Sequence, residues 1–274
     1  MIGKYVDETQ GNEALAEQAL RRALELSPRL AVAHKYYAML EADLGRAATA
    51  MVRLLGEADR HGNDPELFAG LVHACRYCGL LEPSIAAHHE ARRLDPNIAT
   101  SGQQSVLMTC DIERLLAFDR ASGTGGDEII RVVGLGLAGR RDEARREHAK
   151  LKTGLIPAFR PWNQSLLAWI DRQPADMRAV RPELGALRIM EDPEAIFQEA
   201  WMLCDAGDQD QGLELLERAV SKGYFVASTL EVGAQFDALR DRPAFQRVLE
   251  AARAGRDAAL AAFREHGGER ILGG

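Results

Sequence analysis

Residues 65–97 read PELFAGLVHACRYCGLLEPSIAAHHEARRLDPN and contain two helical patterns joined at a glycine. Before Gly79, the positions that share one helical face are Phe68, Leu71, Val72 and Cys75. After it, the corresponding positions are Ser84, His88 and Ala91. Glycine permits the positive φ that ends a helix tightly, and Pro96 closes the second helix because proline cannot continue one. The stretch therefore predicts two antiparallel helices in a hairpin.

The same pattern returns with a period of 34 residues. Gly11, Gly45 and Gly79 are 34 residues apart, and Gly139 and Gly207 are separated by twice that number. Partial copies of the hairpin are found at both ends of the chain: Ala16, Leu20 and Ala23 early, and Ile196, Ala200, Leu203, Leu216 and Ala219 late. Small residues let antiparallel helices approach closely, and large apolar ones fill the space between neighbouring hairpins. A fixed period of this length is typical of stacked helical repeats.

The repeat is interrupted in the middle of the chain. Gly79 and Gly139 are 60 residues apart, which is 8 short of two periods, and residues 119–127 are rich in turn formers. We interpret this region as a shortened helix and a loop. The copy over residues 161–190 is degenerate, with Pro174 at the turn and Pro182 inside the second helix. Because Gly11 already lies at a turn position, we expect a piece of a longer chain or an unusual amino-terminal cap.

The predicted fold is all-α, an α-α superhelix of antiparallel hairpins that ends in a capping helix. We expect repeats over residues 1–120, a loop over 121–127, a second set of repeats over 128–242, and a capping helix with a tail over 243–274. No segment alternates apolar and polar residues for long enough to predict a strand.

Several passages are similar to one known family. The period and the hairpin pattern resemble the tetratricopeptide repeat. The passages 94–100, 137–144, 215–224 and 236–245 resemble the carboxy-terminal tetratricopeptide region of bacterial multidomain signalling proteins, where it follows a serine/threonine kinase, a nucleotide cyclase or a winged-helix domain. The resemblance implies a sensor or interaction module and transfers no catalytic residue. The sequence departs from the family at Cys110, where glycine is common, and over 174–182.

The composition narrows the class of protein. The chain of 274 residues is 46% hydrophobic and 27% charged, which is ordinary for a folded globular protein. Its formal net charge of −7 argues against a dedicated nucleic-acid binder. No apolar run is long enough for a membrane span, and the start of the chain lacks a signal peptide. With four cysteines that follow no disulfide framework, we expect a cytoplasmic location.

Three motifs suggest chemistry, but each has a simpler explanation. Gly134–Gly139 forms a GxGxxG pattern, yet residues 155–164 lack the acid that a dinucleotide site needs for the ribose. Cys75 and Cys78 form a CxxC pattern without the second pair of a zinc site. His88 and His148 fall at positions that usually hold a large apolar residue. We interpret all of these as packing residues and expect no cofactor and no metal.

The resemblance also implies where a partner binds. Repeats of this kind bind with the first helix of each hairpin, which lines a concave groove. The matching positions here are Lys35, Met39, His73, Arg76, Tyr77, Gln104, Arg160, Asn163, Phe197 and Trp201. The leading hypothesis is a non-catalytic scaffold or regulatory module that holds a peptide or partner domain in this groove. The alternative is an enzyme or a small-molecule or nucleotide sensor with a central pocket near Gly134–Gly139.

Overall fold

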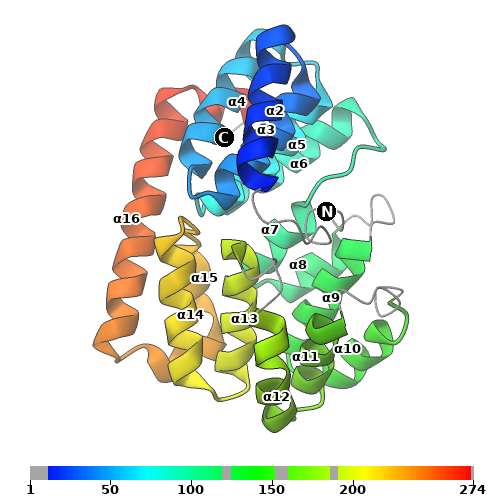
Figure 1. The fold of residues 1–274 in the computed structure, drawn as a ribbon, viewed down its shortest axis with the longest axis vertical. Helices are drawn as coiled ribbons and strands as arrows, with labels where there is room; N and C mark the ends of the chain where they lie inside the picture. The colour runs from blue at the N-terminus through cyan, green and yellow to red at the C-terminus, as the bar shows by residue number, and fades with distance from the viewer. Residues whose placement is uncertain (1–11, 119–124, 152–159, 186–190, 273–274) are drawn as a thin grey trace.

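A computed structural model describes residues 12–118, 125–151, 160–185 and 191–272, and every regular element in these ranges is a helix (Figure 1). The first half contains α2 (Asn12–Leu26), α3 (Ala31–Asp43), α4 (Ala47–His61), α5 (Pro65–Tyr77), α6 (Leu81–Leu94), α7 (Gly102–Met108) and α8 (Ile112–Ala117). The second half contains α9 (Gly125–Leu137), α10 (Arg141–His148), α11 (Arg160–Ile170), α12 (Pro174–Gly185), α13 (Pro193–Asp205), α14 (Gln209–Ser221), α15 (Ala227–Val232), the 3₁₀ helix η4 (Ala234–Leu239), α16 (Pro243–Glu265) and α17 (Gly268–Leu272). The all-α prediction is confirmed.

Consecutive helices pack as antiparallel hairpins. The hairpins are α3–α4, α5–α6, α7–α8, α9–α10, α11–α12 and α13–α14. The first helices of successive hairpins also touch, so that α3 packs on α5, α5 on α7, and α7 on α9. Helix packing therefore follows the order of the sequence over this part of the chain.

Each hairpin turns at one residue in the left-handed backbone region. These residues are Gly45, Gly79, Cys110, Gly139, Arg172 and Gly207, at intervals of 34, 31, 29, 33 and 35 residues. In five of the six turns, the next residue donates its N–H to the carbonyl five residues back, as Leu80 does to Cys75 over 2.9 Å. The predicted turns at the four glycines are confirmed, and the structure adds two turns that have no glycine.

The added turns account for the irregular middle of the chain. The 8 missing residues belong to the hairpin α7–α8, whose helices have 7 and 6 residues and whose turn is at Cys110. The structure contains shortened helices, as predicted, but they precede residues 119–127, to which the prediction assigned the irregularity. The predicted loop over 121–127 lies outside the described residues up to 124, and α9 has already begun at Gly125. In the degenerate copy the turn residue is Arg172, whereas Pro174 begins α12.

The two ends of the array meet. Figure 1 shows α16 running along one side of the molecule past both halves, and the carboxyl terminus returns to the first hairpins. The helix α16 packs on α4, α14 and α15, and α17 packs on α4 and α6. At the α14–α15 connection, Phe225 donates its N–H to the carbonyl of Tyr77 over 2.9 Å. The hairpins therefore close into a ring instead of extending as an open array.

No helix in the described ranges is both long and apolar enough to cross a lipid bilayer.

Substitutions at two turn glycines distinguish the cost of the left-handed backbone conformation from the cost of disturbing the contact that closes the ring. At Gly139, with a φ of +74°, a Cβ would meet no atom within 4 Å. At Gly79, with a φ of +73°, a Cβ would overlap the carbonyl oxygen of Phe225. We expect Gly139→Ala to cost about 1–2 kcal/mol of unfolding free energy and Gly79→Ala about 3 kcal/mol or more. Urea unfolding of both variants measures the difference. Equal costs would mean that Phe225 does not approach this turn.

Candidate functional site

The predicted groove exists as a face of the fold, but the chain itself fills it. We call the sides of α5, α7, α9 and α13 that point to the centre of the ring the inner face, and residues 224–239 the central segment. Seven side chains of the central segment are completely buried: Tyr224, Val226, Ala227, Thr229, Leu230, Phe236 and Leu239. The inner face is therefore occupied along the part that the groove prediction assigned to a partner.

The central segment is hydrogen-bonded to each helix of the inner face. It reaches α5 through the N–H of Phe225, α7 through the hydroxyl of Thr229, and α9 through the amide of Gln235. Thr229 donates to the carbonyl of Met108 over 2.6 Å. The indole of Trp201 on α13 donates to the side chain of Gln235 over 2.9 Å. The donors and acceptors of these bonds are buried or partly buried and are paired with one another, so the bonds fix the central segment in one position.

Aromatic rings complete this contact. Phe197 packs against Tyr224 and Phe236, and Trp201 stacks on Phe236 with ring centroids 5.9 Å apart. Tyr77 meets Tyr224 edge to face at 5.0 Å. Four predicted groove residues, Arg76, Tyr77, Phe197 and Trp201, are thus at most 2% exposed. Truncating one of them removes core contacts first, because none of the four faces solvent.

The most polar part of the inner face is centred on Arg76. This side chain has no exposed surface and forms two hydrogen bonds with Glu194, from Nε to Oε1 at 2.5 Å and from Nη2 to Oε2 at 3.1 Å. Its Nη1 donates to the carbonyl and hydroxyl oxygens of Ser101, and Nη2 also donates to Nδ1 of His73. Tyr224 donates to Glu194 over 2.9 Å, and Tyr77 donates to Asp192 over 2.8 Å.

The electrostatics of the cluster follow from burial. Desolvation is the largest single influence and lowers the pKa of Arg76. The charge of Glu194 and its hydrogen bond, together with Tyr224 and Tyr77, outweigh desolvation and raise the pKa above the usual value. Burial, together with Glu194, raises the pKa of Tyr224 well above its usual value. Arg76 therefore stays charged and Tyr224 neutral at physiological pH. Because the arginine and both tyrosines are fully buried, the arrangement holds two halves of the chain together and offers no reactive group to a substrate.

The other predicted groove residues are not brought together. Lys35 is half-buried and pairs with Glu66 at 2.5 Å, and Asn163 is hydrogen-bonded to His148 at 2.7 Å. Met39 and Gln104 are half-buried, and Arg160 is exposed at the start of α11. These five residues do not join Arg76 and Trp201 around the central segment, so the ten positions do not form one continuous open surface.

The GxGxxG pattern is a helix-packing feature. Gly134 and Gly136 lie within α9, where a Cβ would overlap Leu115 at the first and the ring of Trp169 at the second. Gly139 is the turn residue of the hairpin α9–α10. The interpretation as close-packing positions is confirmed for Gly134 and Gly136, and the side chains that cover these two leave no room for a phosphate at their backbone.

The cysteines and the two histidines occupy packing positions as well. Cys75 and Cys78 are buried free thiols, and burial raises the pKa of Cys78 to about 12. A thiol with such a pKa is a poor nucleophile and a poor metal ligand at neutral pH. His88 is buried and shares a hydrogen bond of 2.6 Å with Thr100. Among the described residues, no group of three or more His, Cys, Asp or Glu is placed to hold a metal ion.

One buried carboxyl group was not predicted. Glu199 lies on α13 and is 3% exposed, and neither of its oxygens accepts a hydrogen bond from the residues that the structure describes. Burial raises its pKa to about 7, and the charge of Arg181 on α12 opposes this only partly. The sequence alone does not mark Glu199 as buried, because a glutamate within an amphipathic helix normally faces solvent.

The comparisons with known proteins add no family. No model of a known protein family matches the chain, and no significantly similar sequence is found among curated proteins.

Glu199 predicts a specific dependence of stability on pH. Its folded pKa of about 7 exceeds the reference value of 4.5, so the folded state retains the proton over this interval while the unfolded state loses it. The folded state then binds more protons, and stability falls as pH rises from about 4.5 to 7. We expect Glu199→Gln to raise the unfolding free energy by about 3 kcal/mol at pH 8 and by less than about 1 kcal/mol at pH 5.

The measurement is urea unfolding of the unchanged chain and of Glu199→Gln, each at pH 5 and at pH 8. Gln is a close neutral analogue of the protonated carboxyl, so shape and packing are matched. An equal difference between the proteins at pH 5 and pH 8 would show that Glu199 titrates as an ordinary exposed carboxyl.

Proposed function

We propose that the chain is a non-catalytic interaction module built from tetratricopeptide-like hairpins. The observation that supports this is the repeated hairpin, which turns at a left-handed residue six times at intervals of 29–35 residues. Repeats of this design present several helices and turns side by side, which gives a large surface for a protein partner. Following the resemblance of the sequence, the partner is a protein or a signalling domain that is fused to the chain or acts beside it.

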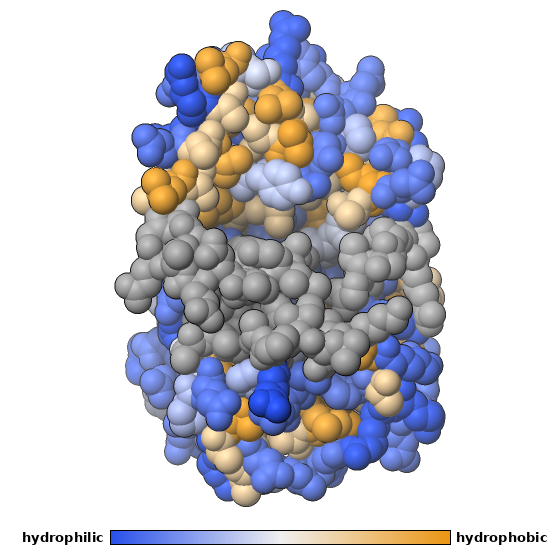
Figure 2. Space-filling model, turned by 45° about the vertical axis from the view of Figure 1, so that its right-hand side comes forward, coloured by the Kyte–Doolittle hydropathy of each residue, from blue (hydrophilic) through white to orange (hydrophobic). Residues whose placement is uncertain are grey.

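The filled inner face changes where the partner binds. Because residues 224–239 already cover Arg76, Tyr77, Phe197 and Trp201, a partner meets the outside of the ring. Figure 2 shows apolar side chains gathered on the upper part of one face and a mostly hydrophilic lower part. Among the described residues, five of the six most exposed large apolar side chains lie on or beside α2 and α3: Leu15, Leu26, Leu30, Tyr36 and Leu44.

The alternative, a small-molecule or nucleotide sensor near Gly134–Gly139, has less support. Gly134 and Gly136 are covered by Leu115 and Trp169. A hollow of about 120 Å³ nearby is lined by Leu135 together with Leu116, Arg131, Arg140, Glu143, Arg146 and Glu147. This volume is well below the roughly 300 Å³ at which ligand pockets usually begin.

The test is to isolate a partner and then reconstitute the complex. The immobilised chain is used to capture candidates from cell extract, and each identified candidate is purified and titrated by calorimetry. We expect saturable binding with fixed stoichiometry and a negative heat-capacity change, since a protein interface buries apolar surface. If no purified protein binds saturably while a metabolite raises the melting temperature of the chain, the sensor alternative replaces this proposal.

A further inference from the structure

The middle of the chain has the opposite charge to the rest. Residues 128–190 contain 12 Lys and Arg against 7 Asp and Glu, a formal charge of +5, whereas the whole chain carries −7. The described part of this section comprises α9–α12. An anionic partner is therefore attracted to this section and repelled by the flanking ones, at distances within the screening length.

Two arginines at the edge of this section lack a counter-charge. The aspartates of the α11–α12 and α13–α14 turns each lie near an arginine. The pairs are Arg145–Asp171, Arg141–Asp205 and, at the longer distance of 4.0 Å, Arg181–Asp208. Arg172 and Arg178 are exposed, and their side chains form no ion pair or hydrogen bond within the described residues. Asp176 is the acidic residue of α12 nearest to Arg178 in the sequence. The two are two positions apart, which places them about 200° apart around the helix axis. These two side chains therefore contribute to the surplus positive charge of the section.

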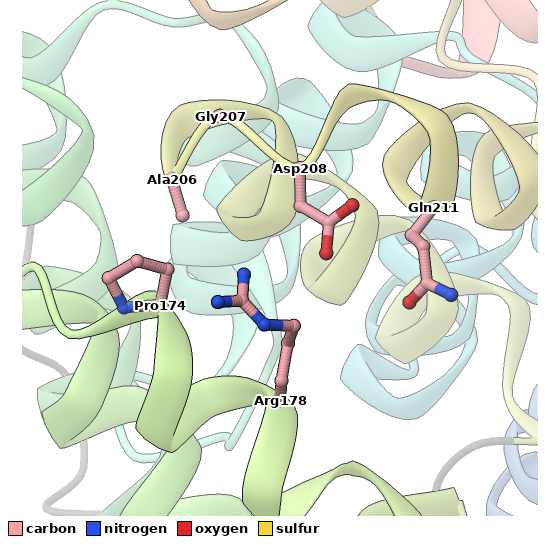
Figure 3. A pocket seen from close by; sticks show the side chains of 6 residues that line it. All are labelled: Pro174, Arg178, Ala206, Gly207, Asp208 and Gln211. Carbon is pink, nitrogen blue, oxygen red and sulfur yellow. The ribbon is translucent and has the colours of Figure 1, made fainter.

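Arg178 faces a hollow between α12 and the α13–α14 turn. The hollow has a volume of about 450 Å³ and is lined by Pro174, Arg178, Ala206, Gly207, Asp208 and Gln211. Figure 3 shows the Arg178 guanidinium directed from α12 toward this turn, with the Gln211 amide farther along α14. A Cβ at Gly207 would meet no atom within 4 Å, so the hollow is open on that side. Its size is in the range of peptide side-chain and small-ligand pockets.

Arg172 stands two residues before the rim of the hollow and in a strained conformation. Its φ of +54° lies in the left-handed region, which four of the six hairpin turns fill with glycine. Side chains with a Cβ are disfavoured there. A glycine would make the same turn without strain, so the fold does not need arginine at this position. Backbone strain of this kind is a reason to look for function.

We propose that this hollow binds an acidic side chain of a partner protein, with the Arg178 guanidinium as the direct ligand and Arg172 adding positive charge at the rim. The inference rests on the proposed function and names the chemistry of the partner. Arginine suits this role because its planar guanidinium meets both oxygens of a carboxylate. Gln211 has an amide that can bond to the partner main chain. Asp208, the one carboxylate of the lining, is partly offset by Arg181, whose Nη1 lies 4.0 Å from its Oδ2.

The experiment uses fluorescent peptides as probes and the whole chain as receptor. Anisotropy is measured at low salt with a hepta-glutamate peptide, a hepta-glutamine peptide and a phosphoserine peptide of the same length. We expect the glutamate peptide to bind, the glutamine peptide not to bind, and Arg178→Gln to weaken binding about tenfold or more. Arg247→Gln, which removes an exposed and likewise unpaired arginine of α16, should leave binding unchanged.

Arg172→Gly separates binding from folding. We expect this substitution to weaken binding of the glutamate peptide several-fold. The melting temperature of the chain should stay equal or rise, because glycine relieves the strained turn.

The inference is overturned by equal binding of the glutamate peptide to Arg178→Gln and the unchanged chain, by an equal loss in Arg247→Gln, or by binding of the phosphoserine peptide without the glutamate peptide. Absence of all binding also overturns it. A purified protein partner that still binds Arg178→Gln with full affinity would reject this site and leave the proposed function intact.

Discussion

The fold depends on one buried ion pair, between Arg76 of α5 and Glu194 of α13, which are 118 residues apart in the chain. A fully buried guanidinium is tolerated only if a charged group and hydrogen-bonding partners compensate the lost hydration. Glu194, Ser101 and His73 supply these partners. Because Glu194 lies in the first turn of α13, two residues after the cap residue Asp192, the pair places the start of that helix against α5. The two halves of the array are held in contact at this point.

Closure of the ring determines what the repeated hairpins can do. An open array of this kind has a free concave face, whereas here residues 224–239 lie across it and are bonded to α5, α7, α9 and α13. The central segment takes the place that a bound peptide has in an open array, so the inner face works as a core. In the proposed function, a partner therefore meets the outer edge of the ring. The strained turn at Arg172 is the clearest place where the local backbone preference and the sequence disagree.

The sequence predicts local features of this protein better than distant ones. The helical period and the turns at Gly45, Gly79, Gly139 and Gly207 follow from residue spacing and from the ability of glycine to adopt a positive φ. Cys110 and Arg172 adopt the same conformation without that signal, so their turns were misplaced or missed. The resemblance to the tetratricopeptide repeat implies the inward direction of Arg76 and Trp201. That the chain itself would cover them was not predictable, because no local pattern links Arg76 to Glu194 or marks residues 224–239 as a filling segment.

The most direct test of this account is a double-mutant cycle across the ring, with Arg76→Met, Glu194→Gln and the double variant compared by urea unfolding. Each single substitution leaves an uncompensated buried partner and should cost about 3–5 kcal/mol. The double variant removes both charges, so its cost should fall short of the sum by about 2 kcal/mol or more. Additivity within about 0.5 kcal/mol would show that the two residues do not interact in solution and that the ring is not closed through α5 and α13.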